Sequence, residues 1–237
     1  MIERLLPLLL CLLVLPACGS RHGLNRADEP SAAPGANDRY ATGEGRATAL
    51  QIFEGEGREQ YQRPDEVIRS MALKEGDVVC EVGAGSGYFT PFLSKAVGAA
   101  GTVYAEDPQP EFLEVLRQKK EMQGLRNVEI VVGTYTDTNL PDRVCDVTFV
   151  LDAYHHFEWP KTMLDAIKRD TKADGRLVIV DWYRRPNEIF DKWGVNAMQH
   201  LRLDIDGVID EIETHGWTHV DTRRFLDHQF FAVFTPR

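Results

Sequence analysis

Short apolar runs alternate with amphipathic stretches along most of the chain. The spacing predicts strands at "DVVCEV", "GTVYAED", "NVEIVVG", "CDVTFVL" and "GRLVIVDWY". Between and around them, apolar positions recur at helical spacing in "RPDEVIRSMAL", "GYFTPFLSKAV", "PQPEFLEVLRQKKEMQG", "PKTMLDAIKRDT" and "DIDGVIDEIETHGW". Strands that alternate with helices indicate a parallel sheet with helices on both faces.

The last two apolar runs follow a different pattern. The runs "HVDTRRFL" and "QFFAVFTP" have only a short turn between them, which predicts a hairpin. Such a hairpin adds an antiparallel strand to the sheet. The predicted fold class is therefore α/β, a Rossmann-like doubly wound, mostly parallel seven-stranded sheet that ends in a C-terminal antiparallel hairpin strand.

The chain begins with an apolar run, Leu5 to Leu15, inside "MIERLLPLLLCLLVLPACGS". The run is too short for a membrane-spanning helix, which needs about 20 residues, and it is typical of a signal peptide. The residues that end at Cys18 resemble the bacterial lipobox, whose cysteine is lipidated and becomes the mature N-terminus. We therefore expect residues 1–18 to be a signal peptide. A plain secretory signal and an uncleaved apolar tail remain alternatives.

The lipobox implies a location. A lipid anchor on Cys18 predicts a protein of the bacterial cell envelope, on the periplasmic side of a membrane. Gly19 follows the cysteine where aspartate would favour the inner membrane, so the outer membrane is favoured.

The next segment and two cysteines complete the organisation. Residues 19–45 are rich in Pro, Gly, Ala and charge, which predicts a disordered linker before a domain over 46–237. Cys80 is expected near the end of one strand and Cys145 at the start of another. Because a disulfide needs Cα atoms within about 7 Å, both are expected to be free, buried thiols.

Charge narrows the range of partners. The formal net charge is −10 over 237 residues, and the longest basic groups are pairs. Binding to a phosphate backbone needs clustered Lys and Arg, so we expect no nucleic-acid partner.

The segment "EVGAGSG" (81–87) places three glycines between a predicted strand and a predicted helix. That arrangement points backbone N–H groups and a helix N-terminus at a ligand. A nucleotide P-loop is excluded because no Lys follows Gly87. A dinucleotide fingerprint needs glycine where Tyr88 stands. The pattern is instead G-x-G-x-G, preceded by the acid Glu81.

This pattern resembles motif I of the class I S-adenosylmethionine-dependent methyltransferases, and the order of predicted elements over 60–237 is similar to theirs. The resemblance implies S-adenosylmethionine as cofactor, with no metal required. It implies that Asp107 binds the ribose hydroxyls, with Glu106 a less favoured substitute, and that Asp137 contacts the adenine or only caps a turn. The implied motif I residues are Glu81, Gly83, Gly85, Ser86 and Gly87, with the methionine carboxylate near Ser86 and Gly87.

Methyl transfer needs a nucleophile held in line with the sulfonium, and a group to take its proton. "LDAYHHFEW" follows the fourth predicted strand, at the edge of the sheet where ligands bind. We expect Asp152, His155 and His156 to be catalytic, with Tyr154 and Trp182 facing the substrate. A metal is not expected, because adjacent histidines chelate poorly and no further Cys or His set stands nearby in the sequence.

The function expected is therefore methyl transfer from S-adenosylmethionine to an unidentified acceptor, for which a small molecule is favoured. Export conflicts with this function, since S-adenosylmethionine is made in the cytoplasm. The alternative is an exported, non-catalytic ligand-binding protein that retains the methyltransferase fold. The oligomeric state is not predicted.

Overall fold

The computed structural model describes residues 29–237. The expected signal peptide and the expected anchor Cys18 lie outside the described residues, as does the first part of the expected linker. No helix in the described part of the chain is long and apolar enough to cross a membrane.

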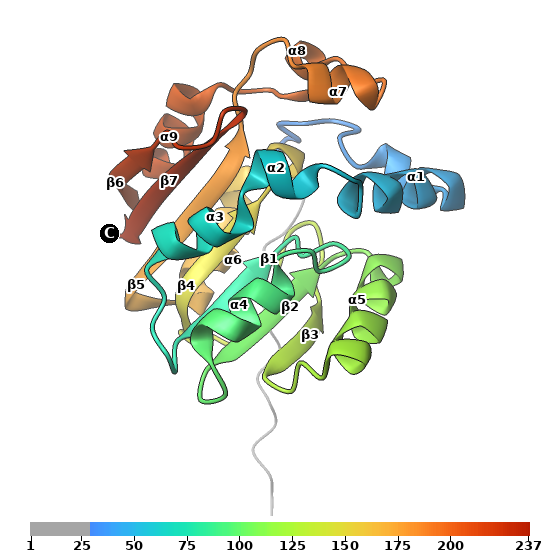
Figure 1. Ribbon diagram of the computed structural model, residues 1–237. Helices are drawn as coiled ribbons and strands as arrows, with labels where there is room; N and C mark the ends of the chain where they lie inside the picture. Colours follow the sequence, from blue (N-terminus) through green and yellow to red (C-terminus); the bar gives the residue numbers. More distant parts are fainter. Residues whose placement is uncertain (1–28) are drawn as a thin grey trace, which may run out of the picture.

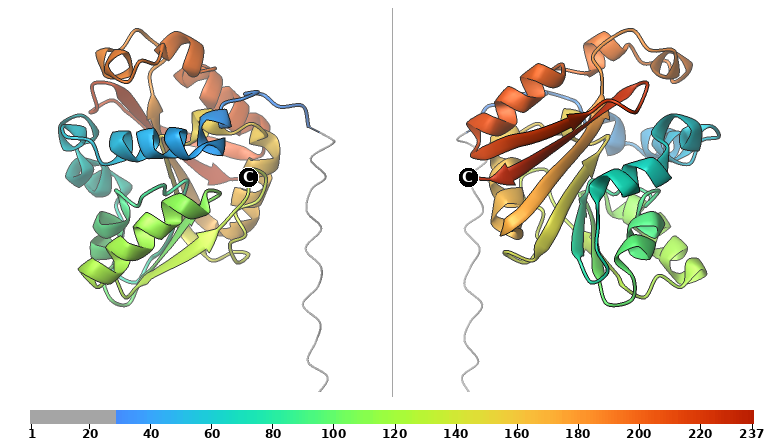
Figure 2. Two further views of the ribbon diagram at one scale, coloured as in Figure 1. Left: turned by 90° about the vertical axis from the view of Figure 1, so that its right-hand side faces the viewer. Right: turned by 60° about the vertical axis from the view of Figure 1, so that its left-hand side comes forward.

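A seven-stranded sheet forms the centre of the fold (Figure 1). Its strands are β1 (Val78–Val82), β2 (Thr102–Asp107), β3 (Val128–Val132), β4 (Cys145–Leu151), β5 (Thr171–Trp182), β6 (Trp217–Arg223) and β7 (Gln229–Pro236). Their order is β3-β2-β1-β4-β5-β7-β6. The first five run parallel, whereas β7 pairs antiparallel with both β5 and β6. The predicted fold class and its C-terminal hairpin are confirmed, and Figure 2 shows β6 and β7 at one edge.

Helices cover both faces of the sheet. They are α1 (Gly43–Phe53), α2 (Arg58–Gln62), α3 (Pro64–Met71), α4 (Thr90–Val97), α5 (Pro110–Gln123), α6 (Pro160–Asp170), α7 (Glu188–Lys192), α8 (Ala197–His200) and α9 (Ile205–Thr214), with 3-10 turns η2 (Asp38–Ala41) and η3 (Tyr154–His156). One core joins the sheet to α3, α4 and α5. A second core joins the other face to α6 and α9.

Prolines mark where several of these helices begin. Pro64, Pro91, Pro110 and Pro160 all occupy the first or second helical position. Proline has no N–H to donate and a backbone angle preset for a helix, so it fits the first turn and disrupts later turns. The helices that begin with Pro91, Pro110 and Pro160 follow β1, β2 and β4. The loops that precede these helices therefore lie at the same edge of the sheet.

The expectation for Cys80 and Cys145 was wrong. The two residues form a disulfide, with Cα atoms 5.7 Å apart. β1 and β4 are neighbouring parallel strands, so the distance criterion that argued against the bond is satisfied. The bond links two strands that end at the same edge of the sheet.

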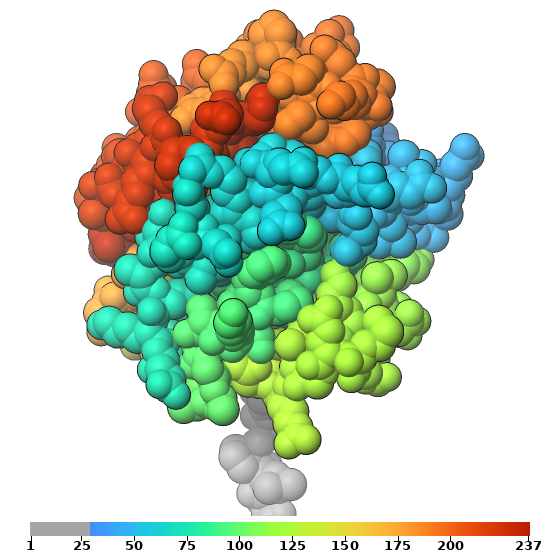
Figure 3. Space-filling model, in the orientation of Figure 1, coloured from blue at the N-terminus to red at the C-terminus, as the bar shows by residue number. Residues whose placement is uncertain are grey.

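The prediction of a disordered linker was also wrong for the described part of that segment. Residues 29–45 contain η2 and the start of α1, and they pack against the domain. The Asn37 side chain donates to the carbonyl of His156, and the Tyr40 ring meets the ring of Phe112 edge-on at 5.5 Å. In Figure 3 the blue surface, to which α1 also contributes, lies between the orange residues around α7 and the green surface of α5. Aromatic contacts thus anchor a stretch whose composition predicts disorder.

Candidate functional site

A cavity lies beyond the carboxyl ends of the parallel strands. Its wall includes the last residues of β1, β2, β4 and β5, namely Val82, Asp107, Leu151 and Trp182. The N-terminal segment covers it from outside. Lining residues from this segment and from α5 and the loop after β3 are Asn37, Arg39, Tyr40, Ala49, Ile52, Phe53, Phe112, Thr134 and Tyr135. The cavity is therefore where this fold class binds ligands.

The glycine loop forms one wall of this cavity. Gly83, Gly85 and Gly87 have φ angles of 76°, 56° and 74°, which side chains rarely adopt. A Cβ on Gly83 would stand 2.6 Å from the Cβ of Ala153, so the loop can pass the end of β4 only as glycine. Of the predicted cofactor-binding residues of this loop, Gly83, Gly85 and Ser86 line the cavity wall. Gly87 instead packs behind the loop, where a Cβ would lie 2.2 Å from Leu116.

Two adjacent acids end β2. The Asp107 carboxylate accepts the backbone N–H groups of Gly85 and Gln109, each at 2.8 Å. Burial raises the pKa of Asp107 to about 6, against the opposing effect of those two hydrogen bonds. Glu106 is buried, and its Oε1 has no hydrogen-bond partner within residues 29–237. Both acids line the cavity, and the Asp107 carboxylate keeps acceptor positions that these two hydrogen bonds do not use.

Glu81 lies beside the main cavity, in a smaller pocket with Arg58 and Tyr88. Its carboxylate accepts the Thr90 hydroxyl at 2.6 Å. Burial raises the pKa of Glu81 to about 7, which the Thr90 bond only partly offsets. In this position Glu81 ties the strand before the glycine loop to the helix after it.

Asp152 stands at the end of β4, in a left-handed conformation with φ 54°. Gln62 donates to its Oδ2 at 2.5 Å, and Gln229 donates to its Oδ1. Burial raises the pKa of Asp152 to about 7. The carboxyl group therefore changes charge near neutral pH, at the wall of the cavity.

His155 and His156 follow on the η3 turn, and both line the cavity. The Nδ1 atom of His155 lies 2.7 Å from Oδ1 of Asp181, and that of His156 lies 3.2 Å from the carbonyl oxygen of Ala36. Burial lowers the pKa of His155, but the charge and hydrogen bond of Asp181 outweigh it, so the pKa rises. Burial lowers the pKa of His156 well below its usual range.

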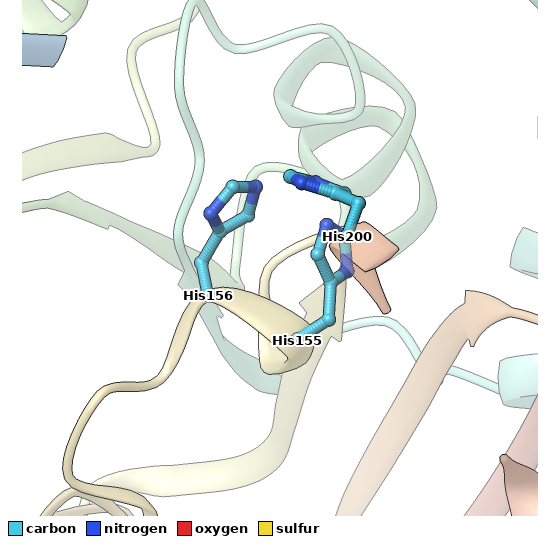
Figure 4. A group of neighbouring side chains, drawn as sticks. All are labelled: His155, His156 and His200. Carbon is cyan, nitrogen blue, oxygen red and sulfur yellow. The ribbon is translucent and has the colours of Figure 1, made fainter. Parts of the chain in front are cut away.

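A third histidine was missed from the sequence. His200, at the end of α8, lies beside the other two, with ring centroids 5.0 Å from His155 and 5.1 Å from His156. Figure 4 shows the three rings facing a common space. The sequence reason for expecting no metal, that no further histidine stood nearby, is therefore wrong.

Two further predicted site residues lie outside the cavity wall, as Glu81 and Gly87 do. Both Nη atoms of Arg169 donate to the Asp137 carboxylate, at 2.9 and 3.1 Å, and Asp137 caps Asn139, so the turn-capping alternative fits it better than adenine binding. The Tyr154 side chain is buried in the core and not at the cavity wall, and its hydroxyl donates to Glu211. Trp182 does line the cavity, with its ring centroid 5.4 Å from that of Tyr61.

The chain is similar to known methyltransferases. A family model described as "Methyltransferase domain" matches residues 80–179, from the middle of β1 into β5. An uncharacterized methyltransferase of Bacillus subtilis, YcgJ, is 29% identical over 140 residues, which are 57% of this chain and 52% of that protein. A protein-L-isoaspartate O-methyltransferase of Methanothrix thermoacetophila is 39% identical over 111 residues, 45% of this chain and 48% of its own length. This chain thus spans about half the length of these curated relatives.

A solved structure extends the similarity over most of the chain. It is a SAM-dependent methyltransferase from Aquifex aeolicus, with 28% identity and a TM-score of 0.74, and the match covers 80% of this chain and 98% of that one. Residues 80–179 therefore match a methyltransferase domain, and the described chain has the Rossmann-like fold of the S-adenosylmethionine-dependent methyltransferases, which implies S-adenosylmethionine as the cofactor.

Proposed function

We propose that this protein transfers the methyl group of S-adenosylmethionine to a small-molecule acceptor. The observation that carries the proposal is the meeting of the Asp107 carboxylate with the backbone of Gly85 at the edge of β2, inside a cavity that this fold class uses for ligands. A carboxylate accepts about four hydrogen bonds, and Asp107 uses two within the protein. Two acceptor positions remain for a pair of hydroxyl groups, which is what a ribose offers.

The residues present fit this cofactor better than a nucleotide phosphate. The loop carries no lysine at its end, and two acids face the cavity from β2, which disfavours an anionic phosphate there. Asp107 would take the ribose diol. Apolar and aromatic side chains, among them Phe112 and Tyr135, would cover the adenine.

The acceptor would lie at the end of β4. Asp152 and His155 line the cavity there and face the same space as Gly83. The carboxyl group of Asp152 has a pKa of about 7, raised by burial, which suits a group that takes a proton from the acceptor at neutral pH. When bound, the cofactor would supply an electrophilic methyl group. The residues that line the cavity need only align the acceptor with it and exclude water.

The location proposed is the cell envelope, by a lipid anchor on Cys18. Two independent observations support export. The first is the signal-like pattern of residues 1–18. The second is the Cys80–Cys145 disulfide, since disulfides persist in oxidising compartments and are rare in the cytosol. The mass of the native N-terminal peptide tests this proposal: a diacylglyceryl group on Cys18 is expected, and an unmodified Met1 would refute it.

The function is tested by calorimetric titration of the full chain, purified in detergent, with S-adenosylmethionine, S-adenosylhomocysteine and NAD. Binding of both adenosyl compounds and none of NAD is expected. Asp107→Ala should abolish measurable binding, whereas Glu121→Gln, an exposed acid on α5, should bind like the native protein. Failure of native protein to bind either adenosyl compound would refute the proposal.

Transfer itself needs a second measurement. Radiolabelled S-adenosylmethionine is incubated with the protein and a small-molecule extract, and labelled products are separated. Binding without any labelled product would favour the alternative, a ligand-binding protein that has kept the fold. Export is the reason for considering that alternative, because S-adenosylmethionine is made in the cytoplasm and an exported protein is separated from its source.

A further inference from the structure

Three imidazole rings from two separated segments meet at the wall of the cavity. One ring nitrogen from each of His155, His156 and His200 lies within 4.8 Å of the other two. The ring centroids are 4.3, 5.0 and 5.1 Å apart, so the three rings form a nearly regular triangle. Figure 4 shows nitrogen atoms of all three directed into the space between them.

Hydrogen bonds on the outer side of the cluster fix which nitrogen faces inward. Asp181 accepts from Nδ1 of His155, and the carbonyl of Ala36 accepts from Nδ1 of His156. A neutral ring that donates from Nδ1 carries its lone pair on Nε2. In metal sites, histidine ligands are held in this way by a carboxylate or a backbone carbonyl. The ring nitrogens of His200 have no hydrogen-bond partner among residues 29–237.

We propose that His155, His156 and His200 bind one divalent transition-metal ion of the zinc type, with Asp181 as the outer carboxylate that orients His155. Three histidines with a free fourth position are a known arrangement for catalytic zinc. Ligand nitrogens about 2.05 Å from a tetrahedral ion lie about 3.3 Å apart. Small rotations of rings already within 4.8 Å would reach that spacing.

The electrostatic environment is compatible with a cation. Arg39 opposes added positive charge near His200, whereas Asp181 favours it. Asp152 adds a second carboxyl group close to His155.

One other contact competes for an inward lone pair. The Tyr40 hydroxyl lies 3.4 Å from Nε2 of His156, which is long for a hydrogen bond from a hydroxyl. A metal at the centre of the triangle would replace this weak contact with a coordinate bond. Packing alone gives no reason for three rings to direct their nitrogens at one another.

The position of the site gives it a role that rests on the proposed function. All three histidines line the same cavity as the glycine loop and Asp107, so the free fourth position faces the ligand space. An acceptor with an oxygen, nitrogen or sulfur donor could occupy that position, next to the methyl group of the cofactor. The acceptor class inferred is thus a small molecule that bears a metal-binding heteroatom.

The full chain, stripped with a chelator, is titrated with Co²⁺ and followed by visible absorption. The proposal expects d–d bands of a four-coordinate ion, saturation at one Co²⁺ per chain, and loss of the bands on addition of Zn²⁺. His200→Ala should weaken binding by at least about 100-fold, and Asp181→Asn by about 10- to 100-fold. His200→Cys, which keeps a ligand atom, should retain the ion.

His215→Ala is the matched control, because His215 lies after α9 and outside the cavity wall. It should bind Co²⁺ like the native chain. Absence of Co²⁺ binding, or equal binding by His200→Ala, would overturn the proposal, provided that circular dichroism shows each variant folded. Titration with S-adenosylmethionine in parallel separates the two proposals. Cofactor binding without metal binding refutes the metal site alone, and metal binding without cofactor binding refutes the proposed function alone.

Discussion

The carboxylate of Asp181 holds His155 by two contacts, 2.7 Å to the ring Nδ1 and 3.1 Å to the backbone N–H. Asp181 belongs to β5, whereas His155 follows β4, so this pair joins the ends of two neighbouring strands. Both side chains are nearly inaccessible to solvent, with 9% of His155 and 3% of Asp181 exposed. The ring of His155 is therefore fixed in orientation and in tautomer before any ligand arrives.

Asp181→Asn should lower the pKa of His155. Burial alone lowers this pKa, and the charge of Asp181 and its hydrogen bond reverse the effect. An amide keeps the shape of the carboxylate but removes the charge, so burial should then dominate. NMR titration of the ring protons measures the change, with the exposed Asp174→Asn as control. An unaltered His155 pKa in Asp181→Asn would show that another group sets it.

The affinity for S-adenosylmethionine should fall as the pH drops below about 6. Asp107 has its pKa near 6, and protonation removes an ionised acceptor from the ribose site. Well below that pKa, binding that requires the loss of one proton weakens about tenfold for each unit that the pH falls. Asp107→Asn should bind weakly and lose this dependence around pH 6. Calorimetry from pH 5 to 8 measures it, and an equally steep profile in the variant would assign the effect to another acid.

Glu81→Gln should flatten the dependence of stability on pH. Burial raises the pKa of Glu81 to about 7 in the folded state, above its value of 4.5 in an unfolded chain. Between these values the folded state binds more protons, so the free energy of unfolding should rise as the pH falls from 8 towards 5. Glutamine cannot titrate, so the free energy of unfolding of Glu81→Gln should rise less over the same pH range. Urea unfolding at several pH values tests this, and identical slopes would contradict it.

Removal of the disulfide should cost about 4 kcal/mol of unfolding free energy. The bond closes a loop between residues 65 positions apart, and loop-closure entropy at that length gives this magnitude. The double variant Cys80→Ala, Cys145→Ala is compared with native protein by urea unfolding. A reductant should lower the stability of native protein and leave that of the double variant unchanged. Equal effects of reductant on both would show that the bond is not formed.

Gly87→Ala should destabilise the protein more than Gly124→Ala. Both residues have positive φ, 74° and 64°, so both variants incur backbone strain of about 1–2 kcal/mol. At Gly87 the new methyl would also meet Leu116 at 2.2 Å, whereas nothing lies within 4 Å at Gly124. The difference between the two unfolding free energies measures the packing of the loop against α5. Equal losses would mean that α5 moves aside freely.

The sheet and the cofactor loop could be predicted because their causes are local. Strands buried on both faces are continuous apolar runs, such as the one that ends at Trp182, and prolines such as Pro64 mark helix starts. The glycines of the loop are required by backbone angles that other residues rarely adopt. Each of these properties depends on a few consecutive residues, so the sequence displays it directly.

The parts that could not be predicted depend on contacts between distant segments. His200 joins His155 only because the connection between β5 and α9 folds back over the cavity. The bond between Cys80 and Cys145 depends on which strands are neighbours. Asp137 was placed by family resemblance, and a bidentate ion pair between this loop residue and Arg169 of α6 holds it elsewhere.

The packing of residues 29–45 against the domain changes where a working fragment of this protein must start. Composition alone would place the boundary at residue 46, and a fragment cut there would lose Asn37 and Tyr40 from the cavity wall. It would also expose Phe112 and remove the carbonyl of Ala36 that orients His156. A truncated domain would thus have a cavity that is uncovered on one side. Weak ligand binding by such a fragment would reflect the truncation and not the affinity of the native site.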